Sequence, residues 1–125
     1  MDRQVLHIAD IVLDWTEWFA WNEVKQDARR PGAVSVPARP GVYEARLTDE
    51  AERLTIGRSS HLRSRVKQGL LKGETVVGRK VRQNEDVSRI LIRWALTDRP
   101  AAAEEELHCQ HTDEFGRLPK HTCHT

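Results

Sequence analysis

The sequence is poor in cysteine and contains no long apolar run. Its two cysteines, Cys109 and Cys123, are too few for the disulfide framework of a small secreted domain and are expected to be free thiols. No apolar run approaches the roughly 18 residues of a membrane-spanning helix. Met1 is followed by acidic and polar residues, so we expect no secretory leader. These absences predict a cytoplasmic protein with no membrane partner.

The length and composition fit one globular domain. The chain has 125 residues, of which 38% are apolar and 31% charged, and this length leaves no room for two independent cores. The net charge is only +1, but residues 53–93 carry eleven Lys or Arg against three acidic residues, hence +8. This asymmetry indicates a surface for a polyanion, although charges on solvated helices are an equally ordinary explanation.

The N-terminal forty residues have the pattern of a helical extension. Apolar residues recur at helical spacing between Ile8 and Phe19, which predicts one or two helices. The tryptophans of "WTEWFAW" are expected to cover the core rather than to stack on bases. Residues 29–41 hold three prolines and two glycines and are expected to be a loop. We therefore divide the chain into a Trp-rich extension, residues 1–40, packed on a core of residues 41–125.

The core has the pattern of a small α/β domain. "GVYEARL" alternates like a half-buried strand, and "LTI" follows after a turn, so the two are expected to form an antiparallel hairpin. A helix capped by Ser59 or Ser60 should bury Leu62, Val66 and Leu70. Residues 73–88 are expected to be a loop that can include a short helix. "RILIRWAL" supplies a third strand, and a helix begins at Pro100. The fold class is α/β, with a mainly antiparallel three-stranded sheet flanked by helices.

The order of these parts resembles the GIY-YIG endonucleases over about 80 residues. The resemblance rests on "GVY" ending at Tyr43, on "TIGRSSHLRSRV", and on "EEELH" followed by "FGRLPKHT". The family arginine, eight residues beyond the second tripeptide's glycine, is Arg65 here, and the family glutamate, three residues before a helical leucine, is Glu104. Family residues are replaced in this sequence by Thr55, His61, Gly69 and Thr122.

The resemblance implies a metal-dependent endonuclease that hydrolyses nucleic acid, with DNA the expected substrate. Tyr43 would accept or relay the proton of the attacking water. Arg65 would hold the phosphate, with Arg58 as a second contact. Glu104 would bind one Mg²⁺, or Mn²⁺ in its place, because Mg²⁺ prefers oxygen ligands and keeps most of its waters.

Other cations of the basic window are candidate contacts to the nucleic-acid backbone. We expect Arg63, Lys67, Lys80 and Arg82 to bind phosphates, with His61 beside them. A catalytically silent relative that only binds nucleic acid through this surface is the main alternative to a nuclease.

A third interpretation is a zinc-stabilised interaction module. Both cysteines and four of the six histidines lie within the last eighteen residues, at His108, Cys109, His111, His121, Cys123 and His124. This is the composition of a zinc site, but the Cys-x-His and His-x-Cys spacings are tighter than those of ordinary zinc motifs. A polar C-terminal tail is the simpler explanation.

Overall fold

The computed structural model describes residues 2–8, 10–26 and 29–122. The strands are β1 (Asp2–Leu6), β2 (Ile11–Trp15), β3 (Phe19–Ala20), β4 (Gly41–Leu47), β5 (Arg53–Ser59) and β6 (Ile90–Leu96). The helices are α1 (Trp21–Lys25), α2 (Leu62–Ser64), the π-helix η1 (Arg65–Leu71), α3 (Val76–Asn84), the 3₁₀ turn η2 (Val87–Arg89) and α4 (Pro100–Phe115). Among these helices, none has the length and apolar character needed to cross a membrane.

The main sheet is antiparallel and has four strands in the order β3-β6-β4-β5. The predicted β4–β5 hairpin is present, with Tyr43 opposite Gly57, and β6 pairs with β4 along its whole length. The prediction of a three-stranded sheet misses one strand, because Phe19 and Ala20 form a short fourth strand, β3, beside β6. A strand of two residues is too short to produce a periodic pattern, so no sequence signal marks it.

The prediction of helices between Ile8 and Phe19 is wrong for residues 11–15. These residues form strand β2 of the β1–β2 hairpin, in which Ile11, Leu13 and Trp15 are buried while Val12 and Asp14 are exposed. That alternation has period two, the period of a strand. The helical spacing includes Ile8, but Ile8 is 84% exposed and belongs to no core. Only Trp21–Lys25 forms the short helix α1.

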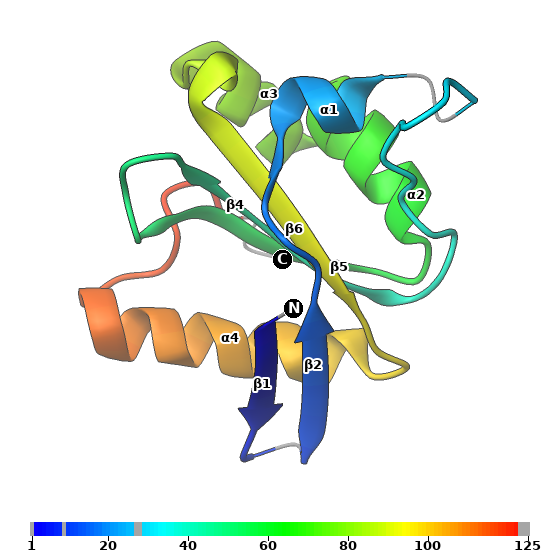
Figure 1. The fold of residues 1–125 in the computed structure, drawn as a ribbon. Coiled ribbons are helices and arrows are strands. Elements are labelled where there is room, and N and C mark those ends of the chain that lie inside the picture. The colour runs from blue at the N-terminus through cyan, green and yellow to red at the C-terminus, as the bar shows by residue number, and fades with distance from the viewer. Residues whose placement is uncertain (1, 9, 27–28, 123–125) are drawn as a thin grey trace.

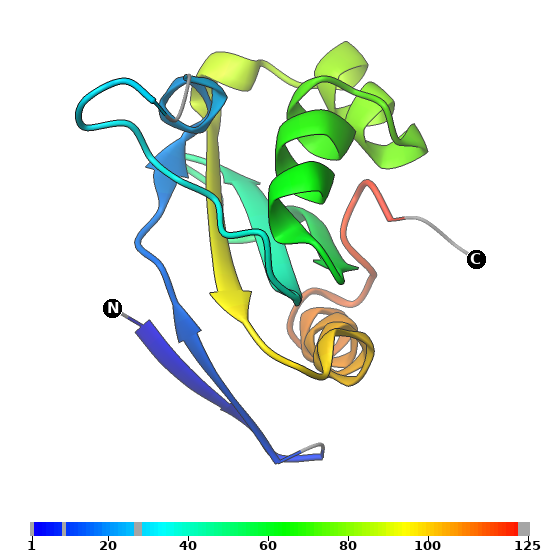
Figure 2. The same cartoon turned by 90° about the vertical axis from the view of Figure 1, so that its right-hand side faces the viewer.

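The two faces of the main sheet are covered by different elements (Figures 1 and 2). The helices α1, α2, η1 and α3 lie on one face, over a core that contains Tyr43, Ala45 and Ile92. The long helix α4 and the β1–β2 hairpin lie on the other face, over a core that contains Val42 and Ile56. Side chains from the N-terminal forty residues contribute to both cores.

The helical passage after β5 buries the predicted side chains. Leu62, Val66 and Leu70 are each at most 1% exposed. The cap differs from the prediction: the N-cap is His61, whose ring Nδ1 accepts a hydrogen bond from the backbone amide of Ser64 at 3.2 Å. Ser59 instead accepts a hydrogen bond from the amide of His61. The helix widens into a π-helix from Arg65 onward, a form frequent at functional sites.

Helix α3 lies within the segment for which the sequence favours no single element, and it packs closely on η1. A Cβ placed on Gly78 would lie 2.0 Å from the carbonyl oxygen of Gly69, so only glycine permits this approach. The Thr75 hydroxyl joins the two helices, because it donates to the Gly69 carbonyl and accepts from the Gly78 amide, both at 3.0 Å. The start of α3 is thereby fixed against η1.

Candidate functional site

A pocket of about 240 Å³ lies at the outer edge of β5 and contains all four predicted catalytic residues. Tyr43 comes from β4, Arg58 from β5, Arg65 from η1 and Glu104 from α4. Four elements separated in sequence therefore meet at one hollow. The remaining lining residues are Thr55, Ile56, Gly57, Thr75, Val76, Val77 and His108.

The position of Tyr43 depends on the glycine across the hairpin. Tyr43 is 5% exposed, and it pairs with Gly57 on β5. A Cβ on Gly57 would lie 2.4 Å from both Cζ and the hydroxyl oxygen of Tyr43. The phenol ring therefore lies directly over Gly57, and any larger residue there would displace it. This contact explains why a tyrosine on one strand is matched by a glycine on the next.

Glu104 is the carboxylate of α4 that faces the pocket. Its Oε1 lies 3.8 Å from Nε of Arg58, and its side chain is 24% exposed. Its neighbours point elsewhere: Glu105 is exposed, and Glu106 is buried against the N-terminal segment, where it accepts a hydrogen bond from the amide of Ile8. Successive helical residues are separated by about 100°, which accounts for this division of the three glutamates.

Arg65 occupies a junction between three hollows. Besides the pocket, it lines a hollow with His61, Ser64 and Gln68 on one side, and another with Ser60 and Arg99 on the other. The Arg65 side chain is exposed, so it is accessible to a ligand in any of the three. A chain-like ligand crossing this surface would pass Arg65.

The structure adds residues that the sequence does not place in the site. His108, considered only as a zinc ligand, lines the pocket, and its Nε2 lies 3.0 Å from the carbonyl oxygen of Ile56 on the outer edge of β5. Thr55, at the family's tyrosine position, is 2% exposed and lies in the pocket wall. Thr75, Val76 and Val77 come from a segment with no clear sequence pattern, so no signal could have found them.

Two of the predicted substrate-binding cations hold the fold together. Arg63 donates from Nε to the carbonyl of Val36 at 2.9 Å, and Lys67 donates from Nζ to the carbonyl of Gln26 at 2.8 Å. Both side chains tie the helix after β5 to the preceding loop and α1. Each of the two therefore has a structural contact, and neither lines the pocket.

The other three predicted contacts remain near the surface. Arg82 donates to the carbonyl of Lys72 at 2.8 Å, Lys80 is exposed on α3, and His61 caps α2 beside Arg65. Neither Lys80 nor Arg82 lines the pocket. Only His61 lies next to a predicted catalytic residue.

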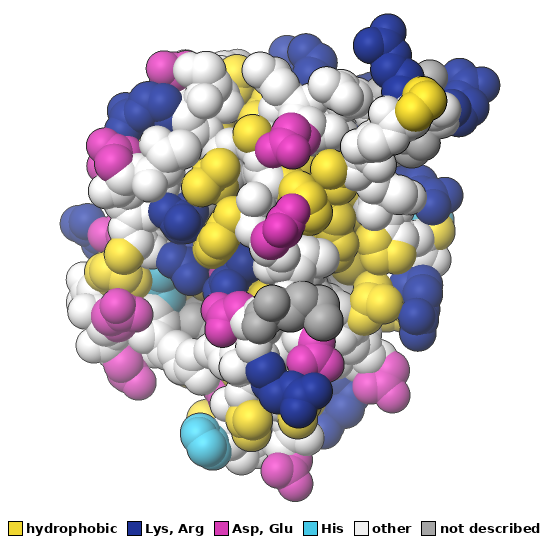
Figure 3. All heavy atoms as spheres, viewed as in Figure 1, with side chains coloured by type: hydrophobic (Ala, Val, Ile, Leu, Met, Phe, Trp, Pro, Cys, Tyr) yellow, Lys and Arg dark blue, Asp and Glu magenta, His cyan; other side chains and the backbone are white. Residues whose placement is uncertain are grey.

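The basic window is distributed over the molecule. Arg58 and Arg65 line the pocket, whereas Arg53 and Arg93 lie beside Glu44 in a cavity under the other face of the sheet. On the face seen in Figure 3, Lys and Arg are interspersed with Asp and Glu around a central hydrophobic area. The charge of +8 along the sequence therefore does not form one continuous surface.

The C-terminal histidines have separate partners. His111 accepts a hydrogen bond from the amide of Arg53, and His121 contacts Glu85 at 2.7 Å. Cys109 is exposed, while Cys123 and His124 lie outside the described residues. Within residues 2–8, 10–26 and 29–122, no group of three or more His, Cys, Asp or Glu side chains could hold a metal ion. The zinc interpretation gains no support here.

The donor set suits a hydrated Mg²⁺ better than a fully enclosed ion. Glu104 offers carboxylate oxygens at the wall of a hollow with room for several waters. Mg²⁺ commonly binds through one or two carboxylates and retains its other waters. Glu104 is the residue that would hold it.

No family model, no curated protein and no solved structure matches this chain.

Proposed function

We propose that this protein is a metal-dependent endonuclease of the GIY-YIG type that hydrolyses phosphodiester bonds of nucleic acid, with DNA the expected substrate. One observation carries the proposal: a single pocket contains Tyr43, Arg58, Arg65 and Glu104, although they come from four elements. Motif spacing alone, without any knowledge of distances, selects three of them, Tyr43, Arg65 and Glu104. That three residues selected by spacing line one hollow supports the proposal.

Each residue has a role that hydrolysis of a phosphodiester requires. The Tyr43 hydroxyl accepts or relays the proton of the attacking water. Arg65 is exposed, remains charged, and can bind two phosphate oxygens at once. Arg58 also lines the pocket and is half exposed, so it can contact the same phosphate. A Mg²⁺ held by Glu104 would neutralise charge on the phosphoryl oxygens and acidify the water.

The contact between Arg58 and Glu104 favours a second candidate, a protein that binds nucleic acid without cutting it. A guanidinium 3.8 Å from the carboxylate competes with a cation for the same oxygen. Because both side chains are partly exposed, the contact is weak and a divalent ion can displace it. In the nuclease, a divalent ion would replace Arg58 as the partner of Glu104. In the silent binder, Arg58 would keep its contact with Glu104.

The deciding experiment measures cleavage and binding with the same substrates. Labelled single-stranded, duplex and flap DNA and single-stranded RNA are incubated with the protein in Mg²⁺, in Mn²⁺ and without metal. A nuclease cuts at least one substrate only with metal. Glu104→Ala should then lower the rate on the order of a thousandfold while binding stays equal or tighter, because the metal is lost but a repelling charge is also removed.

Glu105→Ala is the matched control, because it removes a neighbouring carboxylate that does not line the pocket. It should cut at the parent rate. If the parent binds nucleic acid and cuts no substrate with either metal, the silent binder is correct. If Glu104→Ala cuts as fast as the parent, the metal role of Glu104 is wrong.

A further inference from the structure

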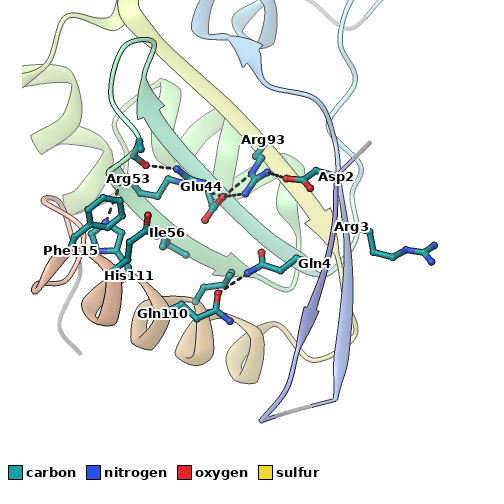
Figure 4. A pocket seen from close by; sticks show the side chains of 13 residues that line it. Asp2, Arg3, Gln4, Glu44, Arg53, Ile56, Arg93, Gln110, His111 and Phe115 are labelled. Atoms are coloured by element: carbon teal, nitrogen blue, oxygen red, sulfur yellow. Dashed lines mark hydrogen bonds and ion pairs between the residues drawn. The ribbon is translucent and has the colours of Figure 1, made fainter.

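A second and larger cavity lies beneath the sheet face that α4 and the hairpin cover (Figure 4). It has a volume of about 430 Å³ and shares only Ile56 with the lining of the pocket at β5. Its polar wall is formed by Asp2, Glu44, Arg53, Arg93, His111 and Glu114. Its apolar wall is formed by Ile56, Leu107 and Phe115. The cavity is not used by the proposed hydrolysis.

Arg93 is buried and paired with two carboxylates, so it forms part of the cavity wall. Its guanidinium lies close to two indoles, 4.2 Å from the ring centre of Trp15 and 4.5 Å from that of Trp18. Its Nε donates to Glu44 at 2.8 Å, and its Nη1 donates to Asp2 at 3.0 Å. The side chain is only 7% exposed. Arg93 is therefore less accessible to a ligand than Arg53, whose side chain is 22% exposed.

Arg53 is incompletely paired. Its Nε lies 3.2 Å from Oε1 of Glu44, yet the N–H is not directed at that oxygen, and this buried nitrogen has no hydrogen-bond partner in the described part of the chain. The same oxygen already contacts both Nε and Nη2 of Arg93. Nη1 of Arg53 bonds the carbonyl of Ala51. A guanidinium has five N–H donors, so Arg53 retains donors for another acceptor.

Arg53 belongs to a cluster of three guanidiniums around one indole ring. Arg46, Arg53 and Arg93 all contact the Trp18 ring, and the carboxylates among them are those of Glu44 and Asp2. Burial lowers the pKa of Arg46, and the nearby charges of Arg53 and Arg93 lower it further. A third carboxylate, that of Glu114, is exposed in the cavity wall and opposes an anion, whereas the remaining N–H donors of Arg53 favour one. Arg3 points away from the cavity and pairs with Asp14.

We infer that this cavity binds a small organic anion, with its phosphate or carboxylate group on Arg53 and its apolar body against Ile56, Leu107 and Phe115. A guanidinium suits both anionic groups, because its N–H donors match two oxygens. The volume exceeds what an inorganic ion needs, and the apolar wall would remain in contact with water around such an ion. A ligand with one anionic end and one flat apolar end can accept hydrogen bonds from Arg53 and pack against the apolar wall. This inference does not depend on the proposed nuclease activity.

The test follows the side-chain Nε–H signal of Arg53 by ¹⁵N-edited NMR in the intact chain. The probes are phenyl phosphate and benzoate as organic anions, inorganic phosphate as a bare anion, and phenol as a neutral body. The signal is assigned by its loss in Arg53→Gln. Phenyl phosphate or benzoate should shift it saturably, inorganic phosphate should bind at least tenfold more weakly, and phenol should leave it unmoved.

Variants separate this site from the pocket at β5. Arg53→Gln should lower affinity for the organic anion at least tenfold in calorimetry, whereas Arg65→Gln should leave it unchanged. Glu114→Gln removes an exposed carboxylate at the cavity and should raise affinity several-fold, and its exposure keeps folding intact. The inference is overturned if no probe moves the Arg53 signal, if inorganic phosphate binds as tightly as phenyl phosphate, or if Arg65→Gln abolishes binding while Glu114→Gln has no effect.

Discussion

Tyr43 and Gly57 form a pair whose positions along the chain are set by the hairpin that holds them. The two lie opposite each other in β4 and β5, and the ring leaves no room for a Cβ on Gly57. Because the hairpin fixes their separation, a motif search of the sequence finds both. Arg65 and Glu104 are found in the same way, by counting from the glycine and from Leu107.

Replacing Tyr43 by Phe removes the hydroxyl and keeps the ring, so it tests the contribution of the hydroxyl alone. The ring continues to fill the space over Gly57, so we expect the fold and nucleic-acid binding to be retained. Cleavage should fall by about 10² to 10⁴, the usual contribution of a positioned acid–base group. Single-turnover rates measure the loss, and thermal unfolding checks the fold. Full activity across pH would show that another group handles the proton.

Residue spacing does not reveal which cations are already engaged. Arg63, Arg65 and Lys67 are close neighbours in sequence, and all three are cationic residue types. Arg63 and Lys67 bond backbone carbonyls of Val36 and Gln26, whereas Arg65 is exposed at the pocket. These carbonyls belong to an irregular loop and a helix end whose path no local pattern specifies. The role of each cation is therefore decided by tertiary contacts.

At the scale of elements, the close packing of η1 on α3 determines one wall of the pocket. A Cβ at position 78 would meet the Gly69 carbonyl at 2.0 Å. Gly78→Ala should separate the helices and destabilise the protein by about 1–3 kcal/mol, although alanine favours helix formation. Urea unfolding measures the change. Lys80→Ala, an exposed change on the same helix, is the control and should stay within about 0.5 kcal/mol of the parent.

The residues after α4 are held to the end of α3 by a charged cluster with a defined pH response. Glu85 contacts Lys120 at 2.8 Å and His121 at 2.7 Å. Burial opposes ionisation of Glu85, but the hydrogen bonds from Lys120 and His121 outweigh it and lower the pKa of Glu85 below its usual value of 4.5. A carboxylate with a lowered folded pKa stabilises the fold above its unfolded pKa, and this stabilisation is lost as pH falls through the folded value.

Glu85→Gln should therefore be less stable than the parent at pH 7. The difference should begin to shrink below about pH 4.5 and disappear once pH is below the folded pKa. Urea unfolding of both proteins between pH 7 and pH 3 measures it, and the exposed Glu105→Gln serves as the control. A difference that stays constant over this range would show that the carboxylate charge contributes nothing.

Elements differ in how well the sequence specifies them. β4, β5, β6 and α4 have clear alternation or strong helix formers, and each forms where its pattern predicts it. The helical prediction is wrong for residues 11–15 because Ile8, Ile11 and Trp15 fit helical spacing by coincidence, while Ile11, Leu13 and Trp15 fit a strand. A short amphipathic strand and a helical turn share apolar positions. The choice between them is made by packing against β6 and α4.

At the scale of the whole molecule, the distribution of charge predicts how nucleic acid binds. The exposed cations Lys80 and Arg82 on α3 lie outside the pocket and would contact only phosphates. Lys80→Ala and Arg82→Ala should each weaken binding to every sequence equally. The log–log salt slope on duplex DNA should drop by about 0.9 for each contact removed. Filter binding from low to moderate salt measures this, and an affinity independent of salt would exclude a polyanion surface.

The contact between Asp2 and Arg93 limits when the β1–β2 hairpin can pack on the main sheet. The two residues are 91 positions apart, and β3 likewise pairs with β6. During synthesis the β1–β2 hairpin emerges well before its partners Arg93 and α4. β4 and β5 are neighbours in sequence and pair with each other, so this hairpin can form while the ribosome is still adding β6. The β1–β2 hairpin is therefore synthesised before the main sheet but packs onto it later. Until then its apolar side chains remain exposed to solvent.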